Sequence, residues 1–85
     1  MKDFAENDLI VFMQQELAKY LFISPETIDI NTPFDKFGID SAKAILIVGK
    51  LEDYLDVELP SKLLWDYNTI GALSSHLHKS ISLYQ

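Results

Sequence analysis

The residues of this chain best placed to do chemistry are Asp40 and Ser41, which follow Gly38-Ile39 and precede a long run with helical spacing. Gly38 allows a tight turn, because a residue without Cβ takes a positive φ at little cost. Asp40 and Ser41 are both residue types that cap helices, since their side-chain oxygens accept from the free N–H groups of a first turn. The pattern therefore predicts a serine hydroxyl at a helix N-terminus, where the helix dipole favours a covalently attached phosphate.

Ser41 is not expected to be a catalytic nucleophile. A catalytic serine needs an adjacent base, an orienting group and donors for an oxyanion. The chain's two histidines, His76 and His78, lie in the last helical segment with no matching acid evident. They are two residues apart and point in different directions around a helix, and no second pair of ligands accompanies them. We expect neither catalysis nor a metal site, and a small serine hydrolase is the least favoured alternative.

The simplest interpretation of Asp40-Ser41 is a helix cap, the usual role of such a pair. The wider run F-x-x-F-G-I-D-S-A-K-A-I-x-x-x-x-x-L-E, which begins at Phe34, resembles the 4′-phosphopantetheine site of acyl and peptidyl carrier proteins. The likeness continues through Leu59-Pro60, L-L-W-D and T-I-x-x-L, and it covers most of residues 34–77. The resemblance is therefore more specific than a lone motif.

The resemblance implies an acyl carrier protein that presents acyl intermediates to enzymes of polyketide or lipid-type biosynthesis. A phosphopantetheinyl transferase would move the arm of coenzyme A onto Ser41, and Asp40 would position the hydroxyl and cap the helix. The thiol of that 4′-phosphopantetheine arm would hold acyl groups as thioesters. The chain has no cysteine, which is consistent with a borrowed sulfur. Further implied partners are an acyl-activating ligase or acyltransferase, and a ketosynthase or other synthase domain.

Apolar residues beside Ser41 predict a docking surface for these partners. A helix over residues 41–55 turns one apolar stripe inward and leaves other apolar positions on the side that descends from the serine. Leu46 is either part of this surface or covered by neighbouring helices. Trp65 either flanks it or is buried, burial being the safer expectation. The expected docking residues are Ala42, Ile45, Leu46, Gly49 and Trp65.

Two positions depart from the usual carrier pattern. Ala42 stands where leucine is common, and Leu46 stands where many fatty-acid carriers have an acidic residue, while Lys43 adds positive charge. Docking through salt bridges alone is therefore not expected. The runs G-I-D-S-A-K-A, L-E-D-Y-L and L-L-W-D-Y-x-T-I most resemble polyketide-type carriers loaded by fatty-acyl-AMP ligases, although Asn68 replaces a frequent proline. The alternatives are a peptidyl carrier domain of a nonribosomal peptide synthase and a non-enzymatic helical interaction module.

Hydrophobic periodicity predicts an all-α fold that positions the serine. We expect a small four-helix bundle with three main helices, a short third helix and a long packed loop between the first two. The helices are expected to start after Asn7 or Asp8, at Ser41, after Ser61 and after Thr69. The first should end near residue 22, the second near residue 55 and the third near residue 66. The inward-facing residues expected are Leu9, Phe12, Met13, Leu17, Tyr20, Leu21, Ala44, Ile47, Val48, Leu51, Leu55, Ile70, Leu73, Leu77 and Ile81.

The loop over residues 23–40 should be packed and not a solvated linker. Ser24-Pro25 is typical of a short turn with proline at its first position. Phe34, Phe37 and Ile39 are too apolar to remain in water. Loops of this length in a compact domain usually have a structural or functional role.

Composition limits the remaining possibilities. The 85 residues, 48% of them hydrophobic, suit one carrier domain over residues 1–85. The net charge is −6 and every basic residue is lysine, which argues against nucleic-acid binding. No apolar run approaches the roughly 20 residues of a membrane span, and the polar, acidic N-terminus is not a signal peptide. We therefore expect a cytoplasmic monomer that binds neither nucleic acid nor membrane.

Overall fold

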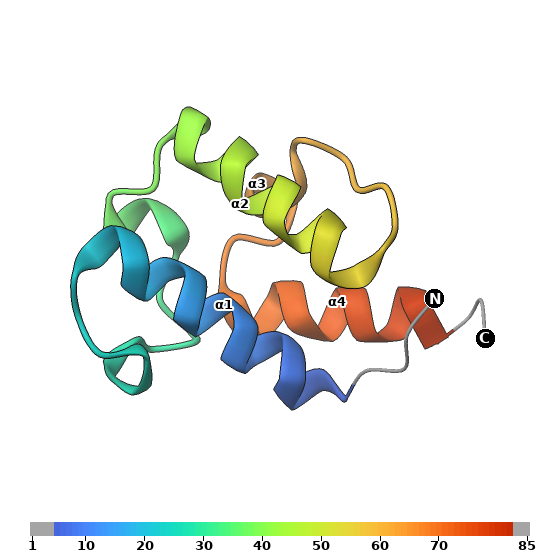
Figure 1. The fold of residues 1–85 in the computed structure, drawn as a ribbon, viewed down its shortest axis with the longest axis horizontal. Coiled ribbons are helices and arrows are strands. Elements are labelled where there is room, and N and C mark those ends of the chain that lie inside the picture. The colour runs from blue at the N-terminus through green and yellow to red at the C-terminus, as the bar shows by residue number, and fades with distance from the viewer. Residues whose placement is uncertain (1–4, 83–85) are drawn as a thin grey trace.

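The computed structural model describes residues 5–82, and this part of the chain is all-helical (Figure 1). α1 and α4 pack against each other, and α3 packs against α2. α1 and α2 run in opposite directions, so the C-terminus of α1 and the N-terminus of α2 lie at the same end of the molecule (Figure 1). The predicted four-helix architecture is confirmed. The elements are α1 (Glu6–Leu21), the 3₁₀ turns η1 (Pro25–Thr27) and η2 (Phe34–Phe37), α2 (Ser41–Leu55), α3 (Leu63–Asp66) and α4 (Ile70–Ser82).

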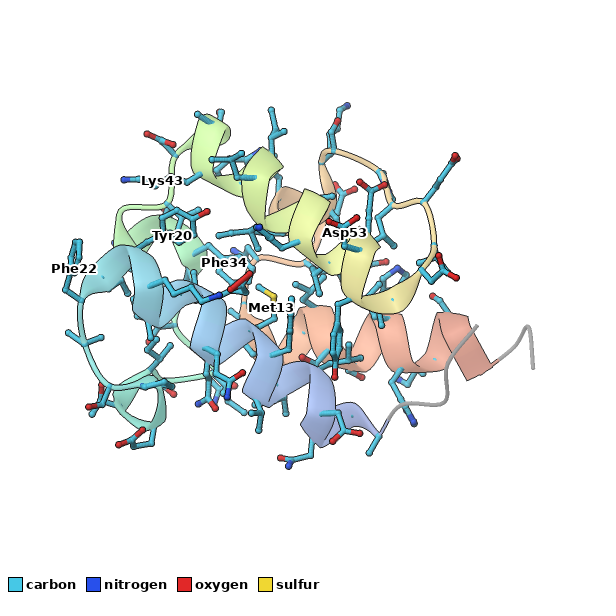
Figure 2. All side chains as sticks on the ribbon, in the orientation of Figure 1. Met13, Tyr20, Phe22, Phe34, Lys43 and Asp53 are labelled. Atoms are coloured by element: carbon cyan, nitrogen blue, oxygen red, sulfur yellow. The ribbon has the colours of Figure 1, made fainter. Side chains whose placement is uncertain are left out.

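The core is built from the apolar stripes that helical periodicity predicts. Every inward position expected on α2 is at most 3% exposed, and Leu51 and Leu55 are fully buried. Met13 of α1 and Phe34 of the long loop are fully buried as well and lie near the centre of the molecule in Figure 2. Burying side chains of this size contributes roughly 1.5–3 kcal/mol each. Ile81, expected in the same core, lies outside the residues whose side chains the structure describes.

The long loop between α1 and α2 is packed, as predicted. Ile28, Phe34 and Ile39 are all buried. Two backbone hydrogen bonds tie this loop to the chain around the start of α4: Phe34 N donates to Asn68 O (2.8 Å) and Gly71 N donates to Ile30 O (2.9 Å). The segment that leads into α2 is thus fixed to the start of α4 at two points.

Two of the predicted helix starts are wrong. α1 begins at Glu6 with Ala5 as its N-cap. Asp8 acts from inside the first turn, where its Oδ2 accepts a hydrogen bond from Ala5 N (3.1 Å). α3 begins at Leu63 with Lys62 as its N-cap, and Ser61 belongs to a preceding turn closed by Leu63 N donating to Pro60 O (3.1 Å).

The predicted cap of α4 is confirmed, because Thr69 Oγ1 accepts from Ala72 N (3.1 Å). α1 ends at Leu21, one residue before the expected boundary. Phe22 is the C-cap, in the left-handed region with φ 57° and ψ 41°. This conformation costs a residue with a Cβ roughly 1–2 kcal/mol. Phe22 therefore does not belong to the buried face of α1.

Candidate functional site

The position of Ser41 is fixed by a turn and two buried neighbours. η2 ends at Phe37, and its C-cap Gly38 has φ 78°, so the predicted tight turn with a positive φ at this glycine is confirmed. Ile39 then enters the core, where it is 3% exposed, and Ala44 of the first helical turn is 1% exposed. Between these two anchors, Asp40 and Ser41 are exposed. The fold thus presents the serine at the surface on a rigid support.

Asp40 is the N-cap of α2, as predicted. Its Oδ1 accepts a hydrogen bond from Lys43 N (2.9 Å), and its backbone oxygen accepts from Ala44 N (2.9 Å). The N–H groups of Ser41 and Ala42 precede this first intrahelical bond. They lie at the positive end of the α2 dipole, which favours an anion.

These residues fit a phosphodiester on Ser41. The group needs an exposed hydroxyl, room for an anion and nearby donors, and the N-terminus of α2 offers all three. The half-buried Lys43 adds the one positive side chain among the first residues of α2. The N-terminus of α2 at Ser41 is therefore suited to hold the charged end of a 4′-phosphopantetheine group.

The site lacks the partners that a hydrolytic serine needs. Among the described residues, no hydrogen bond joins the Ser41 hydroxyl to a histidine or a carboxylate. His76 stacks on Tyr67, with ring centroids 3.8 Å apart and an interplanar angle of 10°. The same part of the chain holds no group of three or more histidine, aspartate or glutamate side chains that could bind a metal ion. The described site is therefore suited to the attachment of a group to Ser41, and it shows no feature that would activate the serine hydroxyl as a nucleophile.

An exposed apolar stripe descends from Ser41 along α2. Its members are spaced three, four and seven residues apart, which places them on one face of a helix. Ile45 is 56% exposed and Leu46 is 57% exposed, so the alternative that other helices cover Leu46 is wrong. A Cβ built on Gly49 meets nothing within 4 Å. We call this set the α2 stripe: Ala42, Ile45, Leu46 and Gly49.

Trp65 is 45% exposed, so the expectation that it is buried is wrong. α3 has a single turn of 4 residues. Leu63 and Leu64 of that turn enter the core, which leaves Trp65 on the outer side. Trp65 is thus exposed on α3, which packs against the helix that carries Ser41.

Acidic side chains gather at the other end of α2. Glu52 Oε2 accepts a hydrogen bond from Leu59 N (2.8 Å), which folds the following segment back on the helix. An open hollow of about 310 Å³ is lined there by Glu52, Asp53, Asp56, Val57 and Glu58. Beyond the Asp40 cap and Lys43, the exposed surface of α2 next to Ser41 is therefore apolar, and the acidic side chains of the helix itself lie at its far end.

Sequence reasoning missed Phe22 and Ile23 as surface residues. Phe22 is 93% exposed and Ile23 is 46% exposed. Both are apolar and directly follow the core stripe of α1, so nothing in a single sequence separates them from core residues. Only the left-handed C-cap turns them outward.

No helix in residues 5–82 is both long enough and apolar enough to cross a membrane.

Known proteins resemble this chain in sequence and in fold. The model of the family described as "phosphopantetheine attachment site" matches residues 12–77. The acyl carrier protein TtuC of Teredinibacter turnerae is 38% identical over 69 residues, which cover 76% of this chain and 79% of that protein. The polyketide synthase PksM of Bacillus subtilis is 30% identical over 73 residues, and the chain spans only 2% of that synthase.

A solved structure is similar as well. It is a free-standing peptidyl carrier protein from a secondary metabolic pathway of Acinetobacter baumannii, with 37% identity and a TM-score of 0.83. The match covers 89% of this chain and 95% of that protein. The likeness therefore extends over nearly the whole of both molecules.

Proposed function

The chain belongs to the family of phosphopantetheine attachment domains, and from this membership we propose that Ser41 Oγ carries the 4′-phosphopantetheine arm. A carrier protein of this family needs one reachable hydroxyl on a rigid support. The observation that carries the proposal is the exposed Ser41 at the first position of α2, next to the Asp40 cap. When bound, the arm supplies a terminal thiol that holds acyl groups as thioesters.

The attachment step is a phosphoryl transfer to the serine. Ser41 Oγ forms a bond to the phosphorus nearest the pantetheine of coenzyme A, and the bond from that phosphorus to the bridging oxygen breaks. Adenosine bisphosphate leaves, and the hydroxyl proton passes to a base of the phosphopantetheinyl transferase. Asp40 keeps the end of α2 in place through its bond to Lys43 N. The catalytic groups all come from the transferase, so the chain needs no catalysis of its own.

Two relatives support the proposal that the chain is an acyl carrier protein. TtuC is named an acyl carrier protein, and PksM is a polyketide synthase. The further partners proposed are an acyl-activating ligase or acyltransferase, and a ketosynthase or other synthase domain, which dock on the α2 stripe and Trp65. A peptidyl carrier is the second candidate, because the Acinetobacter baumannii structure at 37% identity is a peptidyl carrier protein. The cytoplasmic location and the monomeric state expected from the sequence stay predictions.

Intact mass measurement tests the attachment site. The protein is incubated with coenzyme A and a promiscuous phosphopantetheinyl transferase, and we expect the mass of one phosphopantetheine to be added. Ser41→Ala should abolish the addition, whereas Ser61→Ala, which removes another exposed serine, should not. An unmodified wild-type protein beside a labelled control carrier would favour the helical interaction module.

Loading of the modified protein distinguishes the two carrier classes. Fatty acyl adenylates and aminoacyl adenylates are offered together with the adenylating enzymes that make them, and thioester formation is followed by mass. We expect fatty acyl groups to be accepted. A preference for amino acids would assign the chain to the peptidyl carriers.

A further inference from the structure

Phe22 is the most exposed large apolar residue in the part of the chain that the structure describes, at 93%, and Ile23 beside it is 46% exposed. Single apolar side chains on a surface are ordinary. Here two lie next to each other, and one of them is an aromatic ring almost wholly in water. We call Phe22 and Ile23 the apolar corner.

The backbone gives no reason for phenylalanine at this place. Phe22 has φ 57°, a conformation that glycine or asparagine adopts more readily. The bond that caps α1, from Phe22 N to Ala18 O (2.8 Å), uses only main-chain atoms. The ring thus serves neither the cap nor the core.

The apolar corner lies at the end of the molecule where Ser41 is presented. Figure 1 shows α1 ending and α2 beginning at that end. In Figure 2 the side chains of Phe22 and Lys43 both project there, and Lys43 is two residues from Ser41. The acidic hollow that begins at Glu52 belongs to the opposite half of α2. The end of the molecule at which α2 begins therefore carries exposed apolar side chains from the C-terminus of α1 as well as from α2.

We infer that the apolar corner is a contact site for the phosphopantetheinyl transferase that modifies Ser41, an inference that rests on the proposed function. The transferase must bring its active site to the serine hydroxyl at the protein surface, because no arm is yet in place. Enzymes that act later meet a thiol at the end of a flexible arm and can stand further off. Side chains that project at the Ser41 end are therefore closest to the transferase.

The complementary surface on the transferase is an apolar pocket that accepts the Phe22 ring. One turn before Phe22, Lys19 is already paired, since its Nζ lies 2.7 Å from Glu16 Oε2. Aromatic anchors that enter pockets are frequent among the residues that dominate binding energy. The contact is thus expected to act through burial of the ring and to contribute to binding without taking part in the phosphoryl transfer.

Phe22→Asn tests this contact, because asparagine tolerates the left-handed backbone and removes the ring. Unmodified protein is titrated against a promiscuous phosphopantetheinyl transferase with saturating coenzyme A, and product is quantified by intact mass. We expect the KM for the carrier to rise about tenfold with kcat unchanged, the effect of losing one aromatic anchor. Thermal unfolding should occur at the same or a higher temperature. Phe22→Tyr, which keeps the ring, should retain the wild-type KM.

Val11→Ala is the matched control, because Val11 is 41% exposed on α1 and is not part of the corner. Its KM should equal that of the wild type. If Phe22→Asn loses helical circular dichroism, Phe22→Gly replaces it, since glycine also suits positive φ.

The outcomes separate the two proposals. If the wild-type protein is never modified, the proposed function fails. If the wild type is modified and the Phe22→Asn protein has a KM within about twofold of it, or loses only kcat, the function stands and the inference about the corner is overturned.

Discussion

At the residue scale, Asp40 and Ser41 divide the work at the helix end. The Asp40 carboxylate accepts the hydrogen bond from Lys43 N (2.9 Å) that caps the helix. The serine hydroxyl is not used for capping and has no internal hydrogen bond in the described structure. A cap one residue later would have used Ser41 Oγ itself. The order Asp-Ser therefore frees the hydroxyl while the helix stays capped.

Replacing Asp40 tests whether its role is capping. Asp40→Ala should lower the free energy of unfolding by about 1 kcal/mol, because the Lys43 N–H loses its acceptor. Asp40→Asn should stay within a few tenths of a kcal/mol of the wild type, since asparagine caps equally well. Urea titration followed by circular dichroism measures both. Equal losses for alanine and asparagine would mean that the negative charge, and not the cap bond, stabilises α2.

Ser74 differs from Ser41 in that its hydroxyl is buried in the described structure. It is fully buried in α4, and its Oγ has no hydrogen-bond partner. Burial of an unsatisfied hydroxyl costs about 1–3 kcal/mol. Ser74→Ala should therefore raise the free energy of unfolding by about 1 kcal/mol in the same urea assay. A loss of stability would show that the hydroxyl has a partner, such as a buried water.

At the element scale, α2 carries two apolar faces with different purposes. Ile47, Leu51 and Leu55 are fully buried, whereas the α2 stripe faces water. A helix that only had to fold would place polar residues on the second face. The exposed stripe instead offers a partner an apolar surface that begins at the serine.

Gly49 allows the two roles of α2 to be separated. A Cβ there meets nothing within 4 Å, and alanine favours a helix by about 1 kcal/mol over glycine. Gly49→Ala should therefore stabilise the protein by about 0.5–1 kcal/mol in urea titration. If partners approach α2 closely at Gly49, the same variant should also raise the KM for the transferase.

Lys50→Ala, at an exposed position next to Gly49, is the control and should change stability by less than about 0.5 kcal/mol. A Gly49→Ala protein that is more stable and is modified with an unchanged KM would remove Gly49 from the docking surface.

Helical periodicity predicted α2 to the residue, because a proline-free run with a clean inward stripe leaves no competing structure. Starts of helices were harder, since Asn7, Asp8 and Ser61 are all acceptable caps and backbone geometry chose Ala5 and Lys62 instead. Exposure was least predictable. Trp65 and Phe22 are of residue types that are usually buried. Trp65 is exposed because α3 has a single turn, and Phe22 is exposed because it is the left-handed C-cap of α1.

At the scale of the whole molecule, charge and apolar surface are separated along α2. The protein carries a net charge of −6, yet the first three turns of α2 have Lys43 and Lys50 as their only charged side chains. Acidic side chains begin at Glu52 and line the hollow at the far end. Apart from the Asp40 cap next to Ser41, the charges along α2 would therefore draw a basic partner toward the end away from Ser41.

Docking at the Ser41 end should accordingly depend little on salt. Salt screens the interaction between exposed charges that are further apart than the Debye length, which is about 10 Å at 0.1 M ionic strength. Salt does not weaken apolar contacts. The kcat/KM of the transferase for the carrier should change less than about threefold between roughly 0.05 M and 0.5 M sodium chloride. Leu46→Glu puts a carboxylate on the α2 stripe and provides the contrast: if the transferase presents basic side chains, this variant should gain a salt dependence that the wild type lacks. A steep fall for the wild-type protein would place its docking on the acidic end of α2 and contradict the apolar surface argued from Ile45 and Leu46.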